Sequence, residues 1–200
     1  MQFFRSSILS AGLLLGFSSV AAADGEWQTI QTAGDSSITM EIPAGVNQVS
    51  AVDPGKGELM AFFAAKSQGD ETLECFLNRN AYSESMNQAS WNDALASSKI
   101  SILCENSGAT ISHYEADSSQ STTSNGYSAA TCVGAYTDSR EKLPGIVTST
   151  LTVAAPDAIY TLTCDARATD QDEAIAAWMV DWKDTVDHIQ ASLHLPAQTK

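Results

Sequence analysis

Apolar and polar residues alternate in short runs over much of the chain, a pattern typical of half-buried β-strands. In the first half, Ile38–Ile42 alternates before a proline, and 59–65 and 73–77 form two further apolar runs separated by turn residues. The polar segment 24–35, with Trp27 as its aromatic anchor, is compatible with a short strand. The first half therefore predicts strands joined by hairpins.

The second half contains four closely spaced runs that alternate or are rich in β-branched residues. They are 109–117, 127–137, 146–154 and 158–166. The Ser/Thr-rich segment 118–124 is typical of a loop between the first two runs. Because short connectors join antiparallel neighbours, we expect these four strands to form a meander.

Helical spacing replaces the alternation in two places. Over 87–103, apolar and small residues recur every three to four positions, and Ser90 is the expected N-cap. In the second helix, Asp170 is the expected N-cap and Glu173 stands at the capping-box position. The apolar face of that helix comprises Ile175, Trp178, Met179, Trp182, Val186, Ile189 and Leu193. A face of about five turns is long enough to cover a sheet.

The fold class follows from this order of elements. A composition of 44% hydrophobic and 17% charged residues fits a globular chain, and neither an internal repeat nor a linker divides it. We expect one α+β domain over residues 24–200. Its architecture would be an antiparallel sheet of about six to seven strands with two long helices packed on it, sandwich-like.

Residues 1–23 have the features of a secretory signal peptide. Arg5 gives a positive start, 8–17 is an apolar run, and 21–23 is a small-residue cleavage site. The apolar run is too short to cross a bilayer, and no later window is apolar enough to do so. We therefore expect a soluble periplasmic or secreted protein without membrane insertion.

Acidic residues outnumber basic ones. With 24 Asp and Glu against 10 Lys and Arg, the formal charge is −14, and it becomes −15 when Arg5 leaves with the signal. Such a surface repels nucleic-acid phosphates and anionic headgroups, which excludes nucleic acid and membrane surfaces as partners. It favours a basic protein partner. Alternatively, the acidity only keeps an exported protein soluble and implies no partner.

The four cysteines, Cys75, Cys104, Cys132 and Cys164, are widely spaced and even in number. In an exported chain this pattern predicts two disulfides rather than a metal site. Cys132 and Cys164 fall on the second and fourth strands of the meander, about 9 to 10 Å apart, whereas a disulfide needs Cα atoms within about 7 Å. Of the two remaining pairings we favour Cys75 with Cys164 and Cys104 with Cys132.

Motifs of known chemistry are absent from the sequence. There is no GxSxG elbow, HExxH pair or phosphate-cradling glycine loop, so we assign no catalytic residue, metal ligand or cofactor. His188 shares a polar helix stripe with Asp181 and Asp184, which suits either a metal ion or, as we favour, a solvated face. His113 falls within a predicted strand.

The densest group of carboxylates is Asp165, Asp170, Asp172 and Glu173. It lacks the glycine and closing glutamate of a calcium loop, and capping of the last helix explains most of it. Catalysis by paired carboxylates, as in glycosidases, stays open. That chemistry also needs an aromatic platform, for which Trp27 is the tryptophan not already assigned to helix packing.

Three segments resemble the PsbP-like family, whose members include photosynthetic extrinsic subunits and nuclear-transport proteins that bind the GTPase Ran. The segments are Ile38–Gly45 (ITMEIPAG), Ala158–Cys164 (AIYTLTC) and Ile189–Leu195 (IQASLHL). Val46 and Leu193 depart from the family, which often has aromatic residues at both positions. The resemblance implies a sandwich-like domain that binds a partner protein or small ligand and has no shared catalytic centre. No functional residue carries over.

The sequence therefore favours an exported, non-enzymatic binding or accessory protein with an acidic surface. A specific version is an inhibitor or immunity protein for a basic secreted protein. The alternative is a hydrolase or metal-dependent enzyme assembled by the fold from His113, His188 and the cluster Asp170–Glu173.

Overall fold

The computed structural model describes residues 26–32, 35–46, 48–49, 58–66, 70–96, 114–124 and 126–196. The predicted signal peptide, His113 and Cys104 lie outside these residues. Within the part of the chain that is described, every helix is too short or too polar to cross a membrane.

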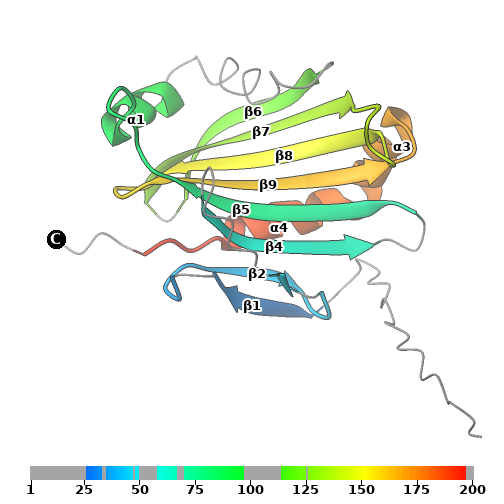
Figure 1. Ribbon diagram of the computed structural model, residues 1–200, viewed down its shortest axis with the longest axis horizontal. Coiled ribbons are helices and arrows are strands. Elements are labelled where there is room, and N and C mark those ends of the chain that lie inside the picture. The colour runs from blue at the N-terminus through cyan, green and yellow to red at the C-terminus, as the bar shows by residue number, and fades with distance from the viewer. Residues whose placement is uncertain are drawn as a thin grey trace, which may run out of the picture.

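An antiparallel sheet of seven strands in the order β3-β4-β5-β9-β8-β7-β6 forms the centre of the fold (Figure 1). The strands are β3 (Gln48–Val49), β4 (Glu58–Lys66), β5 (Thr72–Asn80), β6 (Tyr114–Ser124), β7 (Tyr127–Thr137), β8 (Gly145–Ala154) and β9 (Ile159–Ala168). The predicted α+β class is confirmed, and β6 to β9 form the predicted meander.

One prediction within the meander is wrong. The polar segment 118–124, expected as a loop, continues strand β6 and pairs with β7 as far as Ser124. Among the described strands, β6 ends the order and pairs with β7 only. Polar residues are common on such edge strands because they discourage pairing with other chains.

A second, two-stranded sheet consists of β1 (Trp27–Gln31) and β2 (Thr39–Pro43), which pair antiparallel. This hairpin is joined to the end of the chain by a β-bridge between Thr39 and His194. The amide of His194 donates to the Thr39 carbonyl at 2.8 Å, and the amide of Thr39 donates to the His194 carbonyl at 3.1 Å.

One face of the main sheet is covered by a helix that runs from 171 to 192 (Figure 1). It consists of α3 (Gln171–Ala177), a π-helical turn η1 (Trp178–Trp182) and α4 (Lys183–Ser192). The predicted cap is confirmed, because the Asp170 side chain accepts the Glu173 amide at 2.8 Å.

The expected buried face of this helix needs one correction. Trp178 and Trp182 are buried, but Ile175 and Met179 are exposed. Ala174 and Ala177 face the core in their place. Small alanines let α3 pack closely on the sheet. The expectation that the large apolar side chains face the core was therefore wrong for Ile175 and Met179.

Helix α1 (Gln88–Ala96) packs on the opposite face of the sheet. Its Leu95 clusters with Ala130 and Ala154, whose side chains point away from the long helix because strand residues alternate between faces. Asn87, not Ser90, is the N-cap, since the Asn87 side chain accepts the Ser90 amide at 3.0 Å.

Cys75 and Cys164 form a disulfide, as predicted. The exclusion of a Cys132 to Cys164 bond is confirmed as well. β8 lies between their strands, and Cys132 points to the opposite face of the sheet from Cys164. Cys132 is disulfide-bonded, while Cys104, its predicted partner, lies outside the described residues.

Candidate functional site

Two groups of interacting polar side chains stand out on the described surface. The first, which we name the hairpin groove, lies between the β1–β2 hairpin and α4. It is lined by Thr29, Thr39, Met40, Glu41, His188, Ala191 and Ser192. The hairpin register sets Glu41 directly opposite Thr29, on the same face as Trp27.

His188 is the central residue of the hairpin groove. Its Nε2 lies 2.6 Å from Glu41 Oε2, and its ring stacks on Trp27 with centroids 3.7 Å apart and planes at 21°. Both His188 and Glu41 are about 40% exposed, at 40% and 42%, so water reaches the pair. The geometry fixes the hairpin to the helix through residues 147 positions apart.

The serine, histidine and glutamate of this groove do not form a nucleophilic triad. The Ser192 hydroxyl donates to the Ile189 carbonyl at 2.8 Å, a hydrogen bond within the helix. Its oxygen also accepts the Glu41 amide at 2.9 Å. A nucleophile needs its proton directed at a base, and here the proton is directed at a backbone carbonyl.

The structure does not place His188 with Asp181 and Asp184 in a metal site. Across the described residues, no three His, Cys, Asp or Glu side chains gather closely enough to hold a metal ion. Asp181 and Asp184 are exposed on the helix. The partner of His188, Glu41, could not be found from helical spacing because it lies on a distant strand.

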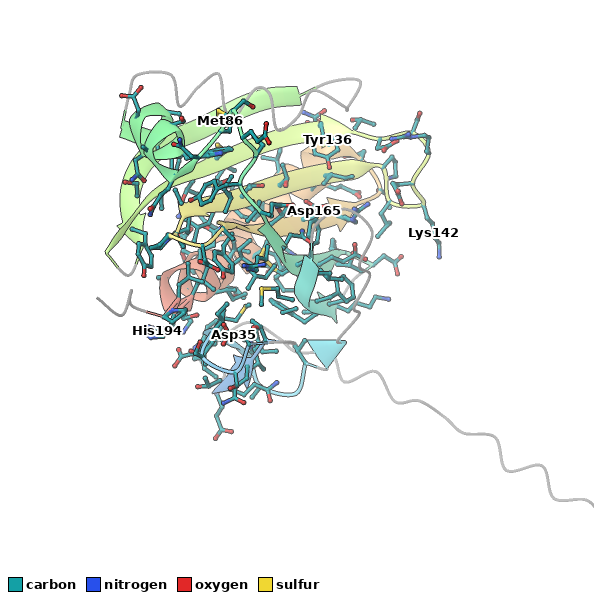
Figure 2. All side chains as sticks on the ribbon, turned by 60° about the vertical axis from the view of Figure 1, so that its left-hand side comes forward. Asp35, Met86, Tyr136, Lys142, Asp165 and His194 are labelled. Carbon is teal, nitrogen blue, oxygen red and sulfur yellow. A yellow bond between two sulfur atoms is a disulfide. The ribbon has the colours of Figure 1, made fainter. Side chains whose placement is uncertain are left out.

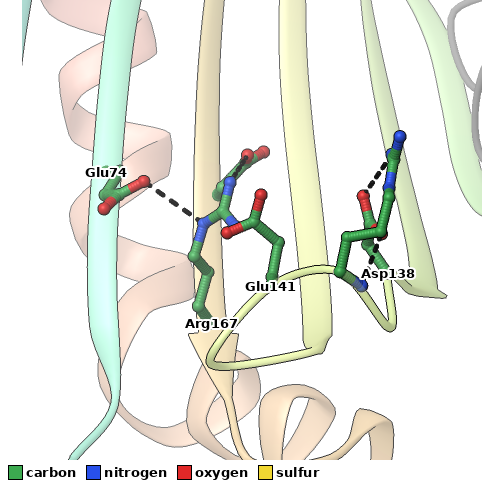
Figure 3. A network of polar contacts seen from close by, with 6 residues as sticks. Glu74, Asp138, Glu141 and Arg167 are labelled. Carbon is green, nitrogen blue, oxygen red and sulfur yellow. Dashed lines mark hydrogen bonds and ion pairs between the residues drawn. The ribbon is translucent and has the colours of Figure 1, made fainter.

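The second group, the Arg167 cluster, lies on the sheet face opposite the long helix (Figure 3). The Arg167 guanidinium contacts Glu74 at 3.2 Å, Asp165 at 3.0 Å and Glu141 at 3.7 Å. Three carboxylates from β5, β9 and the β7–β8 loop thus share one cation. The ion pairs fasten the loop to the sheet.

Asp165 is the buried member of the Arg167 cluster, with 5% of its surface exposed. Burial raises its pKa above the usual value, although hydrogen bonds from Thr148 and Arg167 oppose that shift. Tyr136 lies on the same side of the sheet (Figure 2), and burial raises its pKa to about 12. Burial therefore favours the neutral forms of Asp165 and Tyr136.

The β7–β8 loop beside the cluster is itself stiffened by an ion pair. Arg140 contacts both carboxylate oxygens of Asp138, at 2.8 and 2.6 Å, and its hydrogen bonds lower the pKa of Asp138 to about 2. A hollow next to the cluster is also lined by Lys66 and Lys142. Its mixed charges select neither an anionic nor a cationic ligand.

The carboxylate cluster predicted from the sequence divides in two. Asp165 belongs to the Arg167 cluster, whereas Asp170 caps α3 and Glu173 accepts a hydrogen bond from the Thr169 hydroxyl. His188 lies about 25 Å further along the helix, at 1.5 Å per residue. The described residues therefore do not bring His188 together with Asp170–Glu173, and His113 lies outside them.

Sequence reasoning missed an exposed apolar patch on the long helix. Ile175, Met179 and Val180 are 40%, 63% and 82% exposed. The sequence signal for this patch was the four-residue spacing of Trp178 and Trp182. It places both tryptophans on the side of the helix that faces the sheet, and the residues between them outside.

A scan of protein-family models finds no match to the chain, and neither does a search of curated proteins. Solved structures do match. LpqN of Mycobacterium tuberculosis, involved in cell envelope biogenesis, has a TM-score of 0.50 at 14% identity, covering 84% of this chain and 89% of LpqN. The Ran-binding protein Mog1p of Saccharomyces cerevisiae has a TM-score of 0.50 at 13% identity, covering 85% and 95%.

A cyanobacterial PsbP from Synechocystis is similar over 91% of this chain and 99% of its own, at 14% identity and a TM-score of 0.47. The likeness to LpqN and Mog1p shows the PsbP/Mog1-like fold, as the resemblance implied. At these identities the likeness establishes the fold alone.

Proposed function

We propose that this chain is an exported, non-enzymatic binding or accessory protein whose acidic surface engages a basic partner protein. The observation that carries the proposal is the charge of −14. Carboxylates are concentrated on the outer side of the long helix, where Asp172, Glu173, Asp181, Asp184 and Asp187 are all exposed. Complementary charge mainly accelerates association and selects partners.

Two features support export. Residues 1–23 have the pattern of a secretory signal, and Cys75 and Cys164 form a disulfide, a bond that persists in oxidising compartments. A mature domain beginning near residue 24 follows from the same pattern.

The fold supports a binding role without specifying it. Mog1p is a Ran-binding protein and LpqN acts in cell envelope biogenesis, and both share this fold. The specific version of the proposal is an inhibitor or immunity protein that covers a basic secreted protein.

Capture from the native exported fraction at low and high salt tests this function. We expect a basic protein to be retained at low salt and released at high salt, because screening weakens exposed charge pairs. An unrelated tagged domain of equal negative charge serves as the control bait. Retention of the same proteins by both baits, or binding indifferent to salt, would contradict the proposal.

A further inference from the structure

The outer side of the long helix carries an apolar patch, which we define as Ile175, Ala176, Met179 and Val180. Ile175 and Met179 are four residues apart, as are Ala176 and Val180, so the four side chains are neighbours on one surface. Met179 and Val180 are among the most exposed large apolar residues of the described chain, at 63% and 82%.

Met179 and Val180 of the patch lie on the π-helical turn. Trp178 and Trp182 mark its two ends and are both buried against the sheet, at 4% and 2% exposure. Residues four apart share one side of a helix, so both indoles face inward while Met179 and Val180 between them face solvent. π turns often occur at functional sites.

Carboxylates flank the patch along the helix. Asp172 and Glu173 precede it, and Asp181 and Asp184 follow it, all exposed. Lys183, the one Lys or Arg on the described helix from 171 to 192, is paired with Asp187 at 2.6 Å. The surface is therefore apolar in the middle and negative at both ends.

This charge pattern selects among possible occupants. A second copy of the chain, docked face to face about a two-fold axis, would bring like carboxylates together. An anionic lipid surface would be repelled as well. A cationic segment with an apolar face matches both the centre and the ends of the surface.

We propose that the patch is the docking site for an amphipathic, Lys- or Arg-rich segment of a partner protein, which seats apolar side chains on Met179 and Val180. The flanking carboxylates bind its basic residues. This inference rests on the proposed function and specifies the surface and the partner chemistry.

The probe is a synthetic peptide of Leu and Lys with one apolar face, titrated calorimetrically into the full mature chain. Amide chemical shifts locate the site. We expect shifts confined to residues 172–184 and binding that weakens with salt. Met179→Asp and Val180→Asp should each weaken binding about tenfold, since an aliphatic contact is lost. Both changes add negative charge, which alone would strengthen binding of the cationic peptide.

Met86→Asp is the matched control, because Met86 is 36% exposed and lies in another part of the molecule, before α1 (Figure 2). It adds the same charge and should leave peptide affinity within about twofold. The thermal unfolding of all three variants checks that they fold. The double variant Asp181→Asn/Asp184→Asn should reduce the salt dependence and leave the apolar contribution intact.

Absence of peptide binding, shifts elsewhere, or equal weakening by Met86→Asp would overturn the inference. So would a dimer of the free protein that Val180→Asp dissociates, since the occupant would then be a second copy. If a basic partner is captured equally by wild type and Val180→Asp, the inference fails while the proposed function stands. If no basic partner is captured but the peptide binds the patch, the proposed function fails instead.

Discussion

Cys75 on β5 and Cys164 on β9 face each other directly in the middle of the seven-stranded sheet, with Cα atoms 4.1 Å apart and a disulfide between them. The bond joins the β4–β5 hairpin to the meander across 89 residues of sequence. It therefore connects the two halves of the sheet at their shared boundary.

Removing this disulfide should destabilise the fold substantially. A loop of this length predicts a loss of about 3 to 5 kcal/mol in the free energy of unfolding, because the unfolded chain gains conformational freedom. Urea denaturation of Cys75→Ala, Cys164→Ala and the double variant measures it. Each single variant breaks the same bond, so the double variant should lose little more. Additive losses would show that packing, and not the bond, dominates.

The His188 and Glu41 contact should contribute modestly to stability. Both side chains are about 40% exposed, at 40% and 42%, so solvent screens the pair. A double-mutant cycle with His188→Ala and Glu41→Ala should give a coupling energy of about 0.5 kcal/mol. Hydrogen exchange of the β1–β2 amides should accelerate in both single variants. Exchange unchanged from wild type would mean that backbone contacts, namely the Thr39 to His194 bridge and the bond from the Glu41 amide to Ser192, hold the hairpin.

Asp165 should make stability fall with rising pH. Burial raises its pKa above 3.8 in the folded state, so the folded protein retains this proton to higher pH than the unfolded chain does. Its favourable contribution is complete below pH 3.8 and is lost as pH rises through the folded pKa. Relative to Asp165→Asn, wild type should therefore lose stability across this window.

Urea unfolding of both proteins from about pH 3 to about pH 6 tests the sign. The ion pair with Arg167, 3.0 Å away, acts in the opposite direction because it favours the charged carboxylate. If the stability of wild type relative to Asp165→Asn increased with rising pH, the ion pair with Arg167 would have a larger effect on Asp165 than its burial.

Gly145 should not tolerate alanine. A Cβ at this position would overlap the carbonyl of Asp170, the residue that caps α3. We expect Gly145→Ala to cost about 1 to 3 kcal/mol, as overpacking does. Gly126→Ala is the control. Gly126 has φ +84° and open space around an added Cβ, so this variant should cost only backbone strain of about 1 to 2 kcal/mol and no overlap.

Thermal unfolding and amide spectra distinguish the two glycine variants. The Glu173 amide, bonded to Asp170 at 2.8 Å, should shift in Gly145→Ala and stay unchanged in Gly126→Ala. If the Glu173 amide does not shift in Gly145→Ala, strand β8 rather than helix α3 moves to make room for the added Cβ.

Local patterns in the sequence were sufficient for the order of the meander and the cap of the last helix, but not for segment 118–124 of strand β6. Alternation reports which residues of a strand share a face, and connector length reports which strands are neighbours. The expected strand order already disfavoured a bond between Cys132 and Cys164, because a third strand separates them. The Asp170 cap is equally local, since it needs only the amide three residues on.

Tertiary structure alone decided the rest, because periodicity does not report what a face packs against. Small Ala174 and Ala177 approach the sheet, so Ile175 and Met179 point outward against expectation. His188 meets Glu41 from a strand 147 residues away, a contact that no helical spacing contains. The sequence determined the order of the elements and the faces of the strands, whereas close packing between distant elements determined which side chains of the long helix stayed exposed.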